Sequence, residues 1–120
     1  MERPIAYRGR MFAIAYAVDR SGRSPGKEFF DGLPCEDQAK LMRLFALLAD
    51  HGKITNPEKF GNLKGGFREF KSFKVRMPCH FLPGGIVLVT HGFRKKRDKA
   101  PREEIERAER IFHEDEERSR

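Results

Sequence analysis

The sequence predicts one α+β domain: an antiparallel sheet of about four strands, a helical hairpin on one face of it and a closing helix. Three patterns support this class. Large apolar residues alternate with alanine near the N-terminus, apolar residues recur at helical spacing farther on, and three β-favouring runs precede a last helical stretch. A length of 120 residues suits one domain, so we expect residues 1–120 to fold as a unit.

The N-terminal half predicts one strand and two helices. Strand-like alternation covers about residues 11–19. Ser24-Pro25 is typical of a helix start, and this short helix should end near Gly32–Pro34. A longer helix from about residue 36 to 50 carries a leucine-rich stripe and should stop at Gly52. The two helices would form the hairpin that covers the sheet.

The C-terminal half predicts a three-stranded meander. A glycine-rich loop over residues 55–66 leads to strands at 67–71 and 74–82, and a third strand at 86–90 is apolar throughout. Pro78 cannot donate a ladder hydrogen bond, which favours an edge or a bulge there.

A turn centred on Pro83-Gly84 would set the pairing of the last two strands. Phe81 would then face Ile86, Cys79 would face Leu88 and Met77 would face Thr90, and Arg76 would lie beside His91.

After the third strand comes a basic turn at 95–99. Pro101 should then open the last helix, with Ile105, Ala108, Ile111 and Phe112 facing inward. Residues 1–10 and 113–120 should be loose ends.

The positive charge is concentrated in one third of the chain. The formal net charge is +7, yet residues 64–102 hold eleven Lys or Arg against only Glu69 and Asp98, while the remaining residues are slightly acidic. A solvated surface usually mixes its signs, so this clustering predicts a polyanionic partner.

Other function classes lack their signatures. Cys35 and Cys79 have no metal spacing and predict two buried free thiols in a cytoplasmic protein. The four histidines have no metal spacing, and no phosphate-binding glycine motif occurs. We therefore expect no metal and no cofactor. There is no signal-like N-terminus and no apolar run of membrane length, so no membrane association is expected.

Cations interleaved with aromatic residues on a sheet suit single-stranded nucleic acid. The aromatic candidates are Phe67, Phe70, Phe73 and Phe93, with burial in the core as the alternative reading. RNA can be cut without metal when its 2′-OH attacks the adjacent phosphate, provided that cations stabilise the transition state and a group near neutral pKa moves the proton. Arg76 and His91 would supply these two functions.

Several motifs resemble the RelE/ParE toxin superfamily and, within it, the phage-derived HigB-like group. They are Leu63-Lys64, Phe67–Lys71, Val75-Arg76, the stretch Ile86–Lys96 ending in His-Gly-Phe-Arg-Lys-Lys, and Lys99-Ala100-Pro101 before the last helix. The resemblance implies a small RelE-like fold and the toxin of a type II toxin–antitoxin pair. Relatives cleave mRNA in the ribosomal A site with a concave basic sheet face.

By motif, Arg76 and the segment 94–96 correspond to the functional positions of these relatives. The terminal tyrosine that some of them use has no counterpart, which leaves the general base open between His91 and Lys71. The expected catalytic residues are Arg76, His91, Lys71 and Lys95. The expected RNA-binding residues are Lys64, Arg68, Lys74, Arg94, Lys96 and Arg97.

The implied partners are a cognate antitoxin, expected to be a small helix-turn-helix protein, and the ribosome with its mRNA. Two other readings remain open. One is a ParE-like inhibitor of DNA gyrase. The other is a non-catalytic RNA-binding or degenerate prophage protein.

Overall fold

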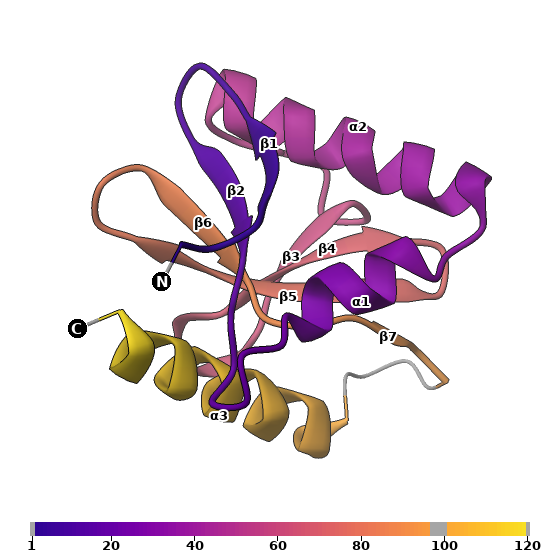
Figure 1. Ribbon diagram of the computed structural model, residues 1–120. Coiled ribbons are helices and arrows are strands. Elements are labelled where there is room, and N and C mark those ends of the chain that lie inside the picture. The colour runs from indigo at the N-terminus through magenta and orange to yellow at the C-terminus, as the bar shows by residue number, and fades with distance from the viewer. Residues whose placement is uncertain (1, 97–100, 120) are drawn as a thin grey trace.

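A computed structural model describes residues 2–96 and 101–119, which form a mixed sheet with helices on both faces (Figure 1). In chain order the elements are β1 (Ile5–Arg8), β2 (Ala13–Tyr16), α1 (Pro25–Asp31), α2 (Cys35–His51), β3 (Phe60–Asn62), a 3-10 turn (Lys64–Gly66), β4 (Arg68–Ser72), β5 (Val75–Leu82), β6 (Ile86–Val89), β7 (Phe93–Arg94) and α3 (Arg102–Arg118). The strands of the described part are ordered β1-β2-β6-β5-β4-β3, and β7 also pairs with β5.

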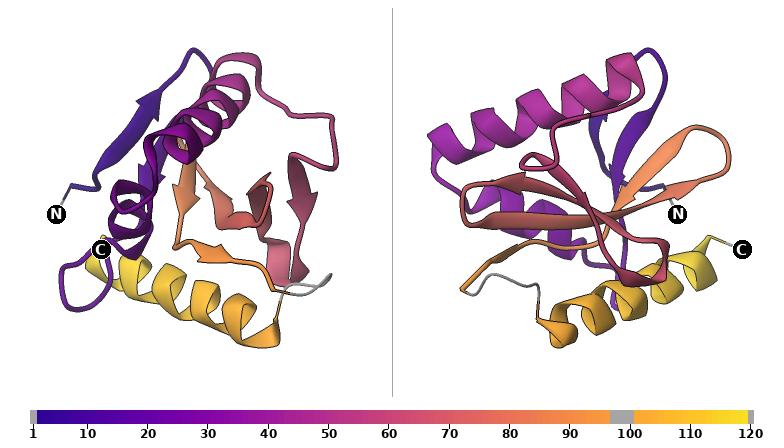
Figure 2. Two further views of the ribbon diagram at one scale, coloured as in Figure 1. Left: turned by 90° about the vertical axis from the view of Figure 1, so that its right-hand side faces the viewer. Right: turned by 180° about the vertical axis from the view of Figure 1, so that it is seen from behind.

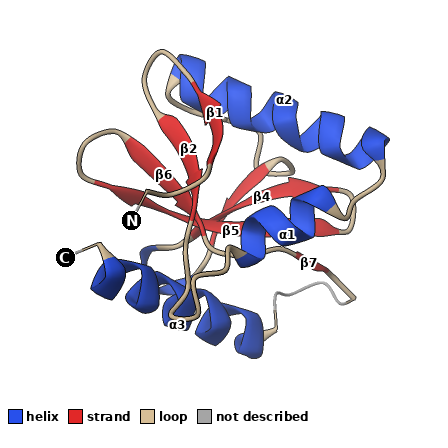
Figure 3. Ribbon diagram, in the orientation of Figure 1, coloured by secondary structure: helices blue, strands red, loops and turns tan. Residues whose placement is uncertain are grey.

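The sheet is larger than the expected four strands, and it is not wholly antiparallel (Figure 3). Strand β1 lies in the segment expected to be loose, and β3 lies in the expected loop. Strands of two to four residues are too short to show periodicity, which explains why sequence patterns miss them. β2 pairs with β6 in parallel, because the chain crosses over through the helices and the meander before it returns beside β2.

Two apolar clusters lie on opposite faces of the sheet. Helices α1 and α2 cover one face and α3 covers the other (Figures 1 and 2). The larger one joins α1 and α2 to the sheet and includes Phe45 of α2, Phe70 of β4 and Met77 of β5. The smaller one packs Ile111 of α3 against the other face, at the end where β2 and β6 meet, and Ala15 leaves room for it. The helical hairpin is thus confirmed as the cover of one face.

The expected register of β5 and β6 is wrong by one residue. Cys79 pairs with Val89 and Leu82 pairs with Ile86, so the loop has three residues and is centred on Gly84. Gly84 and Gly85 both have positive φ, 87° and 77°, a conformation that residues with a Cβ disfavour. The expected turn, with Pro83 and Gly84 as its two central residues, gives a pairing of β5 with β6 that differs by one residue from the observed one.

The bulge expected near Pro78 is confirmed on the partner strand, whereas an edge position is not, since β5 is an interior strand. Cys79 pairs with Val89 of β6, but Arg76 pairs with Phe93 of β7, so the partner register shifts by one residue between them. The Pro78 carbonyl accepts a hydrogen bond from the Thr90 amide at 3.0 Å. The segment between β6 and β7 therefore departs from the ladder next to Pro78, which cannot donate a hydrogen bond to it.

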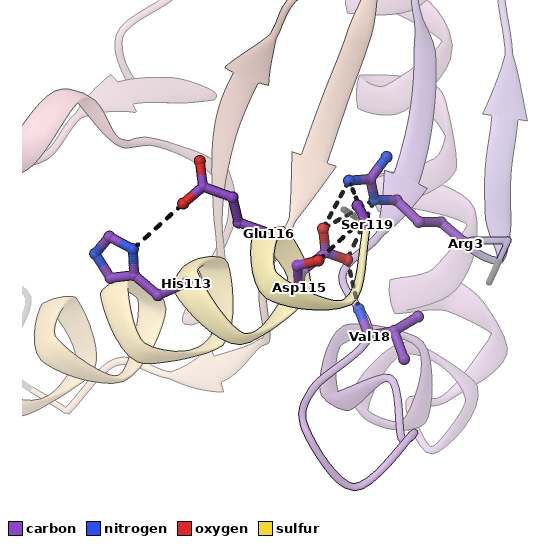
Figure 4. Close-up of polar contacts among 6 residues, drawn as sticks. All are labelled: Arg3, Val18, His113, Asp115, Glu116 and Ser119. Atoms are coloured by element: carbon purple, nitrogen blue, oxygen red, sulfur yellow. Dashed lines mark hydrogen bonds and ion pairs between the residues drawn. The ribbon is translucent and has the colours of Figure 1, made fainter.

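Both ends of the described chain are held in place, which corrects the expectation of loose ends. Helix α3 continues to Arg118, and its buried Asp115 accepts hydrogen bonds from Arg3 (2.7 and 3.0 Å to Oδ1) and from the Val18 amide (2.9 Å), as Figure 4 shows. The neighbouring Glu114 accepts a hydrogen bond from the Arg20 amide at 2.9 Å. These bonds fix α3 across one end of the sheet.

The two cysteines differ in their surroundings. Cys79 is buried in β5, and burial raises the pKa of its thiol. Cys35 is exposed at the first residue of α2, so the expectation of two buried thiols is wrong for it. A helix start after Pro34 places that side chain in solvent.

Candidate functional site

The sheet face opposite α1 and α2 is covered by α3 at one end and carries charged residues at the other. Lys71 of β4 pairs directly with Arg76 of β5, and Arg76 pairs with Phe93 of β7, so all three share this face. Glu69 lies two residues before Lys71 and therefore points the same way. Lys95, two residues after Phe93, acts electrostatically on Glu69. We refer to Glu69, Lys71, Arg76 and Lys95 as the Glu69 cluster.

Glu69 is the buried carboxylate of this cluster. The residue is only 4% exposed, and its Oε1 atom has no hydrogen-bond partner in the described part of the chain. Burial raises the pKa of the Glu69 carboxyl, and the charges of Arg76, Lys71 and Lys95 lower it without cancelling the effect of burial. A carboxylate with a raised pKa is a stronger base than an ordinary glutamate, which suits proton transfer.

Arg76 is held by the backbone of the β4–β5 hairpin. Its Nη1 donates to the carbonyls of Phe73 and Val75, the latter at 3.0 Å. The buried Nε has no partner among the described residues. A guanidinium has five N–H donors in a rigid plane, so the hairpin contacts orient the group and leave donors for a phosphate.

Lys71 lies across the neighbouring strand. Its Nζ donates to the Pro57 carbonyl at 3.0 Å, and a Cβ at Gly61 of β3 would come within 2.7 Å of the Lys71 Cε. Because residue 61 is glycine, the Lys71 side chain can cross β3 at this position without a steric clash. The pairing of β3 with β4 places Gly61 opposite Glu69. Because glycine has no side chain, β3 puts none beside the Glu69 carboxylate at this position.

His91 is not beside Arg76, because the loop and the bulge each shift the register by one residue and together place Phe93 opposite Arg76. The side chain of His91 is fully buried, with Nε2 3.1 Å from Glu104 of α3 and Nδ1 3.1 Å from the Thr90 hydroxyl. Burial, aided by the positive charges of Arg107 and Arg110, lowers the pKa of His91 to about 3. The imidazole is therefore neutral at pH 7 and joins the strand to α3 by hydrogen bonds.

This burial makes stability depend on pH. In the unfolded chain His91 titrates near 6.5, and in the folded chain near 3, so acid protonates the unfolded state first. Its contribution is fully present above pH 6.5 and is lost as the pH falls toward 3, by on the order of 3–5 kcal/mol in total. We expect His91→Gln to flatten the pH dependence of the free energy of unfolding in this range. Chemical denaturation at several pH values measures it.

The exposed His113 provides the matched control for this experiment. The variant His113→Gln should keep the wild-type slope between pH 6.5 and 3. An equal slope in His91→Gln and wild type would show that His91 does not carry the acid sensitivity.

The His-Gly-Phe motif has a packing role in this fold. A Cβ at Gly92 would lie 2.1 Å from the ring of Phe29 in α1, so only glycine allows this close approach. Phe93 is buried and stacks on His91, with ring centroids 5.8 Å apart. The motif thus holds the bulge between β6 and β7 against α1 and α3, and it supports the face on which Arg76 lies.

The remaining predicted cations do not all join the cluster. Arg68 pairs with the core residue Cys79 and lies on the α2 face, with its guanidinium 4.5 Å from the centroid of Phe60. Arg94 points to Asp37 of α2 at 3.9 Å, also away from Arg76.

Three other predicted RNA-binding positions remain. Lys64 lies in the exposed 3-10 turn before β4, where the adjacent Gly65 approaches Glu109 of α3. Lys74 and Lys96 are exposed near the hairpin and after β7. The predicted position Arg97 and most of the basic turn at 95–99 lie outside the described residues.

The aromatic candidates divide in the same way. Phe67, Phe70 and Phe93 are buried, as the core reading predicts, while Phe73 is 73% exposed. Phe73 occupies the hairpin loop between β4 and β5 with φ of 55°. A residue with a Cβ adopts this conformation at a cost of roughly 1–2 kcal/mol.

Sequence reasoning missed Glu69 as a site residue. The available signal was its position, because it is one of only two acidic residues in the basic segment 64–102 and the only one on a predicted strand. A lone carboxylate among cations on a strand has no role in a simple phosphate-binding surface.

Within residues 2–96 and 101–119, no helix is long and apolar enough to cross a bilayer. The same residues contain no group of three or more His, Cys, Asp or Glu side chains that could hold a metal ion.

Comparison with known proteins places this chain in a family. The model of the phage derived protein Gp49-like family matches residues 28–113, which span α2, every strand from β3 to β7 and most of α3. No curated protein matches the chain. The Gp49-like family belongs to the RelE/ParE-like toxin superfamily and is associated with RelE-like endoribonuclease toxins, so the superfamily resemblance is confirmed. This chain is a member of the phage derived protein Gp49-like family.

Proposed function

We propose that this protein is the toxin of a type II toxin–antitoxin pair and cuts mRNA on translating ribosomes. The observation that carries the proposal is the Glu69 cluster, in which a buried carboxylate with a raised pKa lies among three cations on one sheet face. Phosphate binding requires only cations, whereas RNA cleavage also requires a group that takes a proton.

In the proposed reaction the 2′-oxygen attacks the adjacent phosphorus. The O2′–P bond forms, the P–O5′ bond breaks, and the products are a 2′,3′-cyclic phosphate and a 5′-hydroxyl end. Glu69 accepts the proton of the 2′-OH, and Arg76 stabilises the negative charge of the phosphorane. Lys71 or Lys95 donates a proton to the departing 5′-oxygen. Lys74 and Lys96 hold neighbouring phosphates.

His91 acts in this proposal through position only. It supports Phe93, which lies opposite Arg76, and both nitrogens of its buried ring are already hydrogen-bonded, to Thr90 and Glu104. Glu69 replaces it as the preferred general base, and Lys71 keeps a place in the site as a cation.

The proposed partner is an antitoxin of the helix-turn-helix kind that is usual for the HigB-like group, to which we assign the chain. An acidic surface on that protein would cover the Glu69 cluster and keep RNA away from it. The toxin family supports an antitoxin partner, and the positive charge of the sheet face supports its acidic character.

The test is controlled expression with mapping of RNA ends. We expect growth arrest, new 5′-hydroxyl ends inside translated reading frames, and loss of these ends in a reporter mRNA that lacks its start codon. Coexpression of the cognate antitoxin should restore growth.

Two results would contradict the proposal. Intact mRNA together with inhibited DNA supercoiling would support the gyrase reading. Intact mRNA together with retained RNA binding would support a non-catalytic protein.

A further inference from the structure

We propose that Phe73 is a stacking platform for one unpaired base of the mRNA, placed beside the phosphate that Arg76 contacts. This inference rests on the proposed function, which it extends from the reacting phosphate to the recognition of a neighbouring nucleotide.

The ring of Phe73 is presented to solvent by the hairpin loop. Its residue is 73% exposed, the most exposed of the large hydrophobic side chains in the described part of the chain, whereas Phe67, Phe70 and Phe93 are buried. An exposed aromatic ring loses little by stacking on a base and gains the contact that buried rings cannot make.

The backbone holds Phe73 in an unfavourable conformation. Among described residues other than glycine it is the only one with positive φ, at 55°. Glycine or asparagine would adopt this φ more readily, so stability alone does not account for an aromatic residue here. Strain kept at an exposed position points to a use for the side chain.

Arg76 connects the backbone of Phe73 to the cluster. Its guanidinium donates to the carbonyl of Phe73, so the group that would bind the phosphate also fixes the peptide that carries the ring. A phosphate at Arg76 and a base on Phe73 would therefore belong to adjacent parts of one strand.

The charges around Phe73 favour RNA as the occupant. Lys40 of α2 lies over the ring at 4.3 Å from its centroid, and Lys74 follows Phe73 in the loop. The Lys74 carbonyl accepts a hydrogen bond from the Lys95 amide at 2.7 Å, which ties the loop to the segment after β7. A ring with Lys40 over it and Lys74 next in the chain suits a strand that alternates flat bases and phosphates.

The first experiment compares variants in the cutting of a synthetic mRNA on programmed ribosomes. Phe73→Gly should lower kcat/KM roughly ten- to hundredfold, mostly through KM, because the stacked base loses its platform. The variant should unfold at the same temperature as wild type or higher, since glycine removes the strain. Phe73→Trp should retain activity. Met11→Ala, at a 58% exposed apolar residue in the β1–β2 loop, should change neither property.

The second experiment places an abasic nucleotide at successive positions of the same mRNA. For wild type, one position near the cut should slow cleavage by the same factor as Phe73→Gly. That position should have no further effect on Phe73→Gly, because the two changes remove one contact.

The outcomes separate the two proposals. If wild type cuts and Phe73→Gly cuts equally fast, the stacking role is wrong and the proposed function stands. The stacking role is also wrong if every abasic position slows both proteins alike, or if Phe73→Gly loses antitoxin binding alone. If wild type does not cut mRNA on ribosomes, the proposed function fails and this inference fails with it.

Discussion

Arg76→Ala is expected to slow mRNA cleavage roughly a thousandfold while the protein stays folded. The guanidinium is the one planar, permanently charged group of the Glu69 cluster, and a positioned donor of this kind contributes about a hundred- to a thousandfold or more in rate. Single-turnover cleavage on programmed ribosomes measures the effect. A cooperative thermal transition should survive, which shows that the variant is folded.

Two variants test the origin of that loss. Arg76→Lys keeps the charge but loses the rigid fork and the paired bonds to the hairpin carbonyls, so its rate should lie between wild type and alanine. Arg43→Ala on the exposed surface of α2 changes the net charge equally and should cut at the wild-type rate. Equal losses in Arg43→Ala and Arg76→Ala would mean that only overall charge matters.

Glu69→Gln is expected to reduce cleavage by about a hundred- to ten-thousandfold, the usual contribution of a positioned general base. At neutral pH the same variant should be more stable than wild type. Burial raises the pKa of Glu69 above its ordinary value of 4.5, so the ionised side chain destabilises the folded state despite the surrounding cations. Removing the charge removes that cost, an exchange of stability against activity that is common at functional sites.

The pH dependence of the free energy of unfolding shows in which direction Glu69→Gln changes stability. A carboxyl with a raised folded pKa has its full stability below the unfolded pKa and loses it as the pH rises through the folded pKa. The advantage of Glu69→Gln should therefore disappear below about pH 4.5 and grow above it. Glu58→Gln, at an exposed position of equal charge, should show no such crossover. If Glu69→Gln cut as fast as wild type, Lys71 would become the stronger candidate for the base.

Patterns in the sequence predicted the helices and the longer strands because these elements repeat their apolar residues over several turns or pleats. The stripe of α2 and the run of β6 are examples. The short strands β1, β3 and β7 escaped prediction because runs of two to four residues are too short to show a period. The parallel pairing of β2 with β6 escaped because it joins segments far apart in the chain, residues 13–16 and 86–89.

The candidate site was predictable as a region and not as a geometry. The basic segment that contains Arg76 and Lys95 indicated one region of the sheet, and in the structure the charges of both residues act on Glu69 there. A three-residue glycine loop and one bulge decided the rest, and each shifts the register by one residue. Together these shifts place Phe93, instead of His91, opposite Arg76. The buried carboxylate on this face is that of Glu69 on β4.

The parallel pairing of β2 with β6 has a consequence for synthesis. Residues 13–16 form their ladder with residues 86–89, and β2 has its other neighbour in β1, so the sheet cannot close until most of the chain has left the ribosomal exit tunnel. Contacts between such distant segments form slowly. A nascent chain would therefore complete its sheet only near the end of translation.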